Sequence, residues 1–249
     1  MDRRKFITST TALSVMSLMP LSGFSFPGLS EFSKDELMGK ADIKLYGSNK
    51  IRLRKDAFGA YIMMYKAAKQ KGITIQAVSS YRSFEDQKRI WTNKYNRFTA
   101  QGMNPLEAMN KIIEYSTIPG TSRHHWGTDI DIIMGDTGIT DDVLQEKHFE
   151  EGGAFYELKQ WLTKFATTFG FEEVYTNQTQ RKGFKYEPWH FSYSPTSKPM
   201  LKAYRNLDVF SVLSTEDFAG SEHFTTDFLT RYINENIMDI NPVLLPEKD

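Results

Sequence analysis

The chain has 249 residues, of which 40% are hydrophobic and 14% aromatic, and its 31 lysines and arginines are balanced by 31 aspartates and glutamates. This length suits one sizeable domain, or a domain with an appendage, and the neutral charge balance argues against a general nucleic-acid-binding surface. The sequence contains no cysteine, which excludes disulfides, thiolate metal sites and a cysteine nucleophile. Any metal must therefore be bound by histidines and carboxylates.

The first residues are typical of an export signal. Arg3 and Arg4 stand directly before Lys5 and a moderately apolar stretch at residues 11–26. That stretch is too short and too polar for a stable membrane span. We expect residues 1–29 to be a twin-arginine export signal and the mature protein to be periplasmic or in the cell envelope. An ordinary signal peptide and an uncleaved anchor are the alternatives.

The next residues predict a helix, a strand and a second helix. Apolar residues recur at helical spacing over residues 53–70, and Gly72 stands where a left-handed residue would end that helix. Alternating, β-branched residues predict a strand at 73–79. Ser83 is a predicted N-cap, with acidic residues in the first turn of a helix that continues through Tyr95.

Another helix start lies at Asn104, with a cap-type residue followed by Pro105 at the first helical position and Glu107 at the third. The residues expected to form the buried stripe of this helix are Leu106, Met109, Ile112 and Ile113.

A turn and a buried strand follow. Pro119 and Gly120 predict the turn, and the apolar run at residues 128–134 predicts the strand. Side chains alternate between the two faces of a strand, so Asp129 and Asp131 would lie on the same face. The spacing alone therefore leaves open which of the two would bind a metal ion.

The second half of the chain predicts further helices and strands. Helices are expected at 155–169, closed by Gly170, and later at 198–205 and 225–236. Strands are expected at 171–176 and 184–193, with a polar loop between them. We predict that residues 196–249 form a helical extension, packed on the core or on a partner.

Histidines and carboxylates gather at two places in the sequence. His124 stands seven residues before Asp131, and Glu187 stands three residues before His190. A catalytic zinc site requires three histidine or carboxylate ligands, an open position for water, and a further carboxylate that accepts a proton. These four residues satisfy that requirement. We expect Pro188 to bend the strand between Glu187 and His190, so that both reach the same site.

The same residues stand in motifs that resemble those of zinc D,D-carboxypeptidases and D,D-dipeptidases of the VanY/VanX type. Lysostaphin-like endopeptidases and the hedgehog signalling domain belong to the same wider group. The resemblance spans residues 50–195, with one departure at Asp129, where the family usually has a small residue. The motifs are Ser80-Tyr81-Arg82-Ser83 with Gln87, Ser122-x-His124-x-x-Gly127-x-x-x-Asp131, and Glu187-x-x-His190.

The resemblance implies a site with one Zn²⁺ ion bound by His124, Asp131 and His190. Glu187 would be the general base that takes a proton from the attacking water. His125 is the neighbour of a ligand on the chain, and we expect it to point elsewhere.

The resemblance also implies residues that act on the substrate. Arg82 would bind the substrate and stabilise the transition state, because a planar guanidinium pairs well with a carboxylate or an oxyanion. Gln87 and Ser122 would help to bind the substrate. The implied fold is α+β, a small antiparallel sheet with flanking helices and the zinc site in a cleft on the sheet. Residues 30–195 would form this catalytic domain.

The expected activity is that of a zinc-dependent D,D-carboxypeptidase that cuts the terminal D-Ala-D-Ala bond of peptidoglycan stem peptides. An L,D-carboxypeptidase, a D,D-dipeptidase or a peptidoglycan endopeptidase could use the same residues. A cell-wall binding module that contains zinc but does not catalyse is the non-enzymatic alternative. The expected partners are peptidoglycan stem peptides, with no nucleic acid and no stable membrane span in the mature protein.

Overall fold

The computed structural model describes residues 31–139 and 142–247. The predicted export signal, residues 1–29, lies outside the described residues. Residues from Glu31 onward form one compact unit. In the described part of the chain, no helix is both long enough and apolar enough to cross a bilayer.

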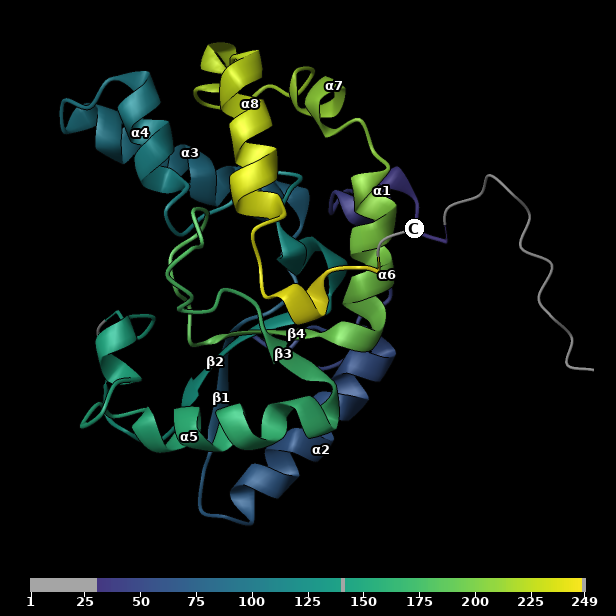
Figure 1. Ribbon diagram of the computed structural model, residues 1–249, viewed down its shortest axis with the longest axis vertical. Helices are drawn as coiled ribbons and strands as arrows, with labels where there is room; N and C mark the ends of the chain where they lie inside the picture. The colour runs from purple at the N-terminus through teal and green to yellow at the C-terminus, as the bar shows by residue number, and fades with distance from the viewer. Residues whose placement is uncertain (1–30, 140–141, 248–249) are drawn as a thin grey trace, which may run out of the picture. The chain divides into compact units, whose positions relative to one another are not determined.

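A small antiparallel sheet lies at the centre of this unit, with the strand order β1-β2-β4-β3 (Figure 1). Each neighbouring pair of strands is antiparallel. The predicted α+β fold is confirmed. The strands are β1 (Ile75–Ser79), β2 (Asp129–Met134), β3 (Phe171–Glu173) and β4 (His190–Tyr193).

Helices lie on both sides of the sheet (Figure 1). The α-helices are α1 (Lys34–Leu37), α2 (Lys55–Lys69), α3 (Phe84–Ala100), α4 (Pro105–Ile112), α5 (Tyr156–Phe165), α6 (Ser194–Arg205), α7 (Val209–Leu213) and α8 (Thr226–Tyr232). Short 3₁₀ turns are η1 (Arg123–Trp126), η2 (Glu146–His148), η3 (Ala166–Phe169), η4 (Ser221–His223) and η6 (Pro242–Leu244), and η5 (Ile233–Ile237) is a π-helical turn.

The two faces of the sheet differ in chemistry because side chains alternate along each strand. Ile130, Ile132 and Phe191 point toward α2 and α5 and belong to a core with residues of those helices. A second core lies among the helices on the other side, where α3, α4 and α8 are drawn in Figure 1. The sheet face turned away from α2 and α5 is therefore free to carry polar groups.

The helix starts predicted at Ser83 and Asn104 are confirmed. Ser83 and Asp86 form a capping box at α3, because each side chain accepts a hydrogen bond from the backbone N–H of the other. Asn104 and Glu107 do the same at α4, with Pro105 in the first turn. These local signals specify where both helices begin, independently of the core.

Several local predictions were wrong. The strand expected over 171–176 ends at Glu173, and the helix expected over 198–205 begins at Ser194. Leu106 is 51% exposed, because it lies on the outer side of α4 while Met109 and Ile112 are buried. The strand expected over 184–193 begins only at His190. Residues before it form a turn, in which the His190 N–H donates to the Glu187 carbonyl over 3.0 Å. Glu187 and His190 thus come together through a turn rather than through a bent strand.

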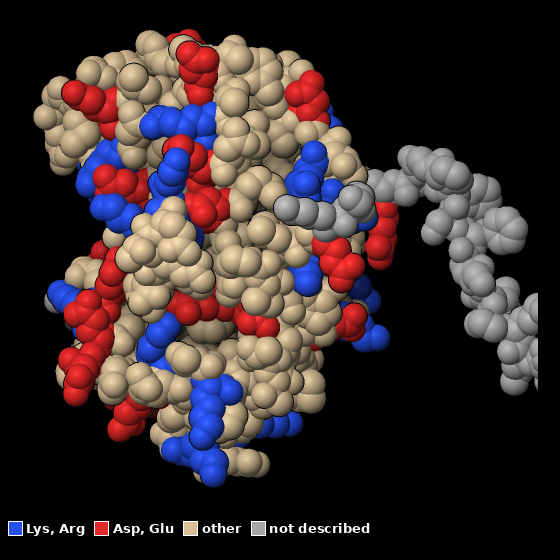
Figure 2. Space-filling view, viewed as in Figure 1, with Lys and Arg blue, Asp and Glu red and all other residues tan. Residues whose placement is uncertain are grey.

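The last part of the chain shares the core of the rest. Residues of α6, α7 and α8 are buried together with Trp91, Met109 and Trp126. That residues 30–195 form the catalytic domain and residues 196–249 a helical extension stays a prediction. On the face shown in Figure 2, acidic and basic side chains are interspersed, as the neutral composition leads one to expect.

Candidate metal centre

Strand register brings the polar residues of β2 and β4 together. Asp131 is paired with His190 and Asp129 with Ser192, on the face opposite to the Ile130–Phe191 pair. Directly opposed residues of an antiparallel pair have their Cβ atoms about 5 Å apart. The sheet therefore places an aspartate beside a histidine on the face away from α2 and α5.

His124 reaches the same place from the 3₁₀ turn η1. The Ser122 side chain caps this turn by accepting a hydrogen bond from the His124 N–H over 3.3 Å. Gly127 ends the turn at a φ of 66°, a left-handed conformation that favours glycine. The His124 Nδ1 lies 2.7 Å from the Ser80 carbonyl oxygen and donates to it, because a carbonyl only accepts. The other ring nitrogen, Nε2, lies 3.4 Å from Asp131 Oδ2.

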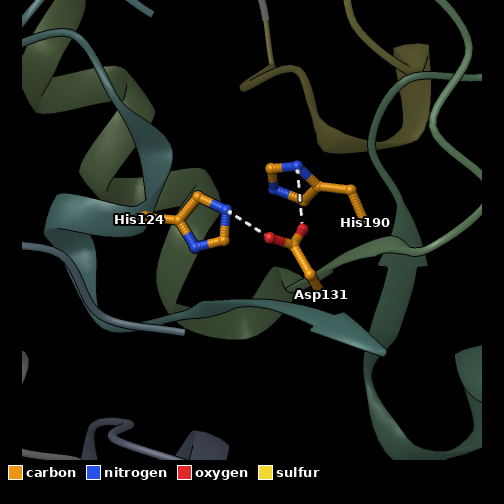
Figure 3. A group of neighbouring side chains, drawn as sticks. All are labelled: His124, Asp131 and His190. Atoms are coloured by element: carbon orange, nitrogen blue, oxygen red, sulfur yellow. Dashed lines mark ion pairs between the residues drawn. The ribbon is translucent and has the colours of Figure 1, made fainter. Parts of the chain in front are cut away.

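His190 presents its other ring nitrogen to the same aspartate. Its Nδ1 lies 3.6 Å from Asp131 Oδ1 and 3.0 Å from Glu187 Oε2. Its Nε2 lies 3.0 Å from Asp129 Oδ2. Figure 3 shows the Asp131 carboxylate between the rings of His124 and His190.

The donor set of these three residues fits a metal ion. One possible ligand atom from each of His124, Asp131 and His190 lies within 4.8 Å of the others, and all three residues are buried. Asp131 Oδ1 is buried without a hydrogen-bond partner, which is costly for a carboxylate oxygen and is relieved by a cation. Two imidazole nitrogens and a carboxylate are typical zinc ligands.

The buried charges of the site shift one another's pKa values. Burial raises the pKa of Asp131, but the charges of His124, His190 and Arg82 outweigh burial and lower it to about 2. Burial and the neighbouring Arg82 lower the pKa of His124. Burial raises the pKa of Glu187, more than its hydrogen bond with His190 lowers it. Near neutral pH the site therefore offers an ionised Asp131 and a neutral His124.

Arg82 lies at the edge of this group and lines the same cleft. Its Nη2 donates to Asp131 Oδ2 over 3.1 Å, and its Nε donates to Ser79 Oγ over 3.0 Å. The register of β1 against β2 shifts between Ala77 and Ser79, so that Ser79 is paired with Asp131. This irregularity is what brings the Ser79 hydroxyl within reach of Arg82.

Gln87 and Ser122 have different surroundings. Gln87 is fully buried, its Nε2 donates to the Thr117 carbonyl over 2.8 Å, and its Oε1 accepts from Arg82 Nη1 over 3.4 Å. Ser122 caps the turn of His124 and also lines the cleft. Their role in substrate binding stays a prediction.

His125 and Asp129 are not members of the cluster of possible ligands. The His125 Nδ1 donates to the Arg82 carbonyl over 2.7 Å, and its Nε2 accepts from the Gly120 N–H over 3.1 Å. His125 therefore points away from Asp131, as expected. Asp129 contacts Nε2 of His190, whereas Asp131 faces Nδ1 of the same ring.

A cleft of about 750 Å³ opens in front of the cluster. Tyr175 and Lys94 are among the lining residues that the sequence did not single out. Tyr175 stands edge-on to the His190 ring at 5.0 Å between ring centroids. The half-buried Lys94 lies on α3, and its Nζ is 2.6 Å from Ser116 Oγ. No local signal marks either residue, because both reach the cleft only through tertiary packing.

Comparison with known proteins gives matches to one family. The sequence model of VanY, described as D-alanyl-D-alanine carboxypeptidase, matches residues 50–196. The putative carboxypeptidase YodJ of Bacillus subtilis (strain 168) is 32% identical over 144 residues, 57% of this chain and 46% of YodJ. A D-alanyl-D-alanine carboxypeptidase of Enterococcus faecalis (strain ATCC 700802 / V583) is 26% identical over 154 residues, 61% of this chain and 52% of that protein. The chain thus spans about half the length of both relatives.

Two solved structures have a similar fold. VanYB in complex with D-alanine-D-alanine has a TM-score of 0.52 and 25% identity, covering 72% of this chain and 92% of that one. A variant of the D,D-pentapeptidase VanY from a VanB-type resistance cassette, in complex with Zn(II), has a TM-score of 0.51 and 25% identity, covering 69% and 90%. The family match includes every residue of the cluster and more than half of the 249 residues. This chain therefore belongs to the VanY family of D-alanyl-D-alanine carboxypeptidases.

Proposed function

We propose that this protein is a zinc-dependent D,D-carboxypeptidase that removes the terminal D-alanine from peptidoglycan stem peptides. Family membership and the likeness to a VanY structure that binds D-alanine-D-alanine support the substrate class. The likeness to a Zn(II) complex supports the choice of metal. The observation that carries the proposal is Glu187, whose carboxylate lies in the same cleft as His124, Asp131 and His190.

The proposed ligands of one zinc ion are His124 Nε2, a carboxylate oxygen of Asp131 and His190 Nδ1. When bound, zinc polarises a carbonyl group and lowers the pKa of water, which makes amide hydrolysis possible near neutral pH. The protein's contribution is to present three ligand groups close together in a buried place. Zinc binding requires each of these groups to be deprotonated.

Glu187 is the proposed general base and acid. Its carboxylate takes the proton from the attacking water and then gives that proton to the amine of the leaving D-alanine. Burial raises the pKa of Glu187, which makes its carboxylate a stronger base than an exposed glutamate. Its place on the turn before His190 keeps it beside the metal ligands without requiring it to be one.

Arg82 is the proposed electrostatic residue. A guanidinium that is 24% exposed in the cleft, fixed by Ser79 and Asp131, can stabilise the negative charge that develops on the scissile carbonyl. The same group can pair with the free carboxylate of the substrate. We propose that Gln87 and Ser122 assist substrate binding, Gln87 through its contact with Arg82.

Export to the periplasm or cell envelope also belongs to this proposal. Peptidoglycan lies outside the cytoplasm, and the Arg3-Arg4 pattern predicts an export signal of the twin-arginine type. Detection of the mature protein in a periplasmic fraction, and its loss after substitution of both arginines by lysine, would test this part.

The activity is tested by mass spectrometry of products. The purified protein is incubated with a pentapeptide stem that ends in D-Ala-D-Ala, with zinc or with a chelator, and the Glu187→Gln variant is treated alike. We expect loss of one D-alanine with zinc, and no loss with chelator or in the variant.

Other products would separate the alternatives. Release of a dipeptide, cleavage of a tetrapeptide stem, or an internal cut would assign the dipeptidase, L,D-carboxypeptidase or endopeptidase activity to the same residues. Absence of cleavage of any stem by the zinc-loaded protein would contradict the enzymatic function and favour a binding module.

A further inference from the structure

A network of buried polar side chains lies behind His190, on the side away from Asp131. Its centre is Asp129, which is fully buried. The Asp129 carboxylate accepts hydrogen bonds from Arg123 Nε (2.9 Å), Ser192 Oγ (2.6 Å) and Thr128 Oγ1 (2.8 Å). Its fourth contact is His190 Nε2, at 3.0 Å from Oδ2. Asp129 is thus the point where the network meets the candidate metal centre.

The register of the sheet explains this contact. Asp129 is paired with Ser192, one step along the same face from the pair of Asp131 and His190. His190 is therefore directly opposite one aspartate and diagonal to the other. Its two ring nitrogens face different carboxylates, Nδ1 toward Glu187 (3.0 Å) and Asp131 (3.6 Å), and Nε2 toward Asp129 (3.0 Å).

Arg123 forms a buried ion pair with the Asp129 carboxylate. The guanidinium is buried, donates through Nη2 to Ser192 Oγ over 2.7 Å, and lies 4.8 Å from the centroid of the Trp126 ring. The Asp129 oxygen that faces His190, Oδ2, also accepts from Arg123 Nε over 2.9 Å, so this buried carboxylate is paired with a buried cation. An ionised carboxylate is an acceptor only, so the hydrogen between Asp129 and His190 belongs to the histidine.

We propose that Asp129 is a positioning residue for the metal centre, which accepts the Nε2 hydrogen of His190 and so turns Nδ1 toward Asp131. A neutral imidazole carries one hydrogen, and the nitrogen that donates determines which nitrogen remains for a metal ion. His124 is set in the same way by the Ser80 carbonyl, which receives its Nδ1 hydrogen and leaves Nε2 free. The two ligands thus use different ring nitrogens, and each is oriented by a buried acceptor.

This inference rests on the proposed function only in naming zinc as the ion, and it is tested by metal affinity rather than by cleavage. The zinc dissociation constant is measured by competition with a chromophoric chelator for the wild-type, Asp129→Asn and Ser192→Ala proteins. Loss of a carboxylate that orients a ligand weakens metal binding by about 10- to 100-fold. We expect that loss for Asp129→Asn. We expect no more than about a 3-fold change for Ser192→Ala, which keeps the bond between Asp129 and His190.

A second variant covers the case in which Asp129→Asn does not fold, because it leaves the Arg123 charge buried without its partner. Arg123→Met combined with Asp129→Leu removes both charges and deprives His190 of its acceptor. The same loss of zinc affinity is expected for this pair of substitutions.

A spectroscopic readout tests the tautomer itself. In ¹⁵N-histidine spectra of the zinc-loaded wild-type protein, we expect the hydrogen of His190 on Nε2 and that of His124 on Nδ1. Equal zinc affinity in the wild-type and Asp129 variants, equal losses in the Asp129 and Ser192 variants, or a hydrogen on His190 Nδ1 would overturn the inference, as would a wild-type protein that binds no zinc. Loss of zinc affinity in a protein that cleaves no stem would contradict the carboxypeptidase proposal alone.

Discussion

Glu187 and His190 lie beside each other because a two-residue turn separates them. The proton that Glu187 must take up makes the proposed chemistry depend on pH. A general base acts only when it is deprotonated. Burial raises the pKa of Glu187 above its ordinary value of 4.5. Activity should therefore be present above this raised pKa and should fall as the pH falls through it.

The pH dependence of kcat/KM checks this expectation. The acid limb of the profile should lie above pH 4.5, the ordinary value for a glutamate. An acid limb at or below that value would show that Glu187 is not the base or that its surroundings do not raise its pKa.

Substitution of Glu187 separates catalysis from metal binding. Glu187→Gln keeps the shape of the side chain but cannot take up the proton, so kcat should fall about 10²- to 10⁴-fold. Zinc content, measured by atomic emission, should remain at one ion per chain because Glu187 is not a proposed ligand. Loss of zinc together with activity would instead make Glu187 part of the metal site.

The sequence motifs identified most of the candidate site, whereas strand spacing alone did not distinguish the two aspartates. His124, Asp131, His190 and Glu187 were found by motif resemblance, and the structure brings them into one cleft. Alternation on a strand placed Asp129 on the same face as Asp131, which is correct. Asp129 differs from Asp131 because it pairs with Arg123 and contacts His190 Nε2. The pattern of a single strand cannot show contacts with other parts of the chain.

Local signals at the scale of single elements predicted helix starts better than strand ends. The caps at Ser83 and Asn104 depend on residues three apart in the sequence. The extent of β4 depends on a turn around Pro188 and on pairing with β2 and β3, which lie elsewhere in the chain. This is why the strand predicted over 184–193 was too long.

The loop before Glu187 contacts the C-terminal segment so closely that it requires a glycine. A Cβ atom on Gly183 would lie 1.7 Å from the Glu235 carbonyl oxygen. Gly183→Ala should therefore lower the free energy of unfolding by about 1–3 kcal/mol, because backbone must move to admit the methyl group. Urea unfolding followed by circular dichroism measures this change.

Gly59 provides the matched control for that substitution. It lies in α2 with no atom within 4 Å of an added Cβ. Gly59→Ala should stabilise the protein by about 0.5–1 kcal/mol through helix propensity. Equal effects of the two substitutions would mean that the contact between Gly183 and Glu235 does not persist in solution.

At the scale of the whole molecule, the C-terminal segment contacts both loops that lead into the site. The Tyr204 hydroxyl donates to the Gly120 carbonyl over 2.9 Å, and the Tyr232 hydroxyl accepts from the Ile118 N–H over 3.1 Å. Asp239 accepts hydrogen bonds from the backbone of residues 182 and 183. The residues before His124 and those before Glu187 thus depend on the same segment.

A chain that ends after residue 195 should consequently fail to form a stable site. It would lose the apolar side chains of α6, α7 and α8 that complete the second core. We expect such a truncated protein to lack a cooperative thermal transition and to be digested rapidly by trypsin, unlike the full chain. A truncated protein with an unchanged midpoint and unchanged zinc affinity would show that this segment is a separate appendage.

The identity of the metal ligands is tested most directly by a crystal structure of the zinc-loaded protein, with anomalous diffraction recorded on both sides of the zinc absorption edge. We predict one zinc peak, about 2.0–2.2 Å from His124 Nε2, an oxygen of Asp131 and His190 Nδ1, with Asp129 on the far side of His190. A peak bound through Asp129 or His125, or no zinc peak in this cleft, would contradict the proposed metal centre.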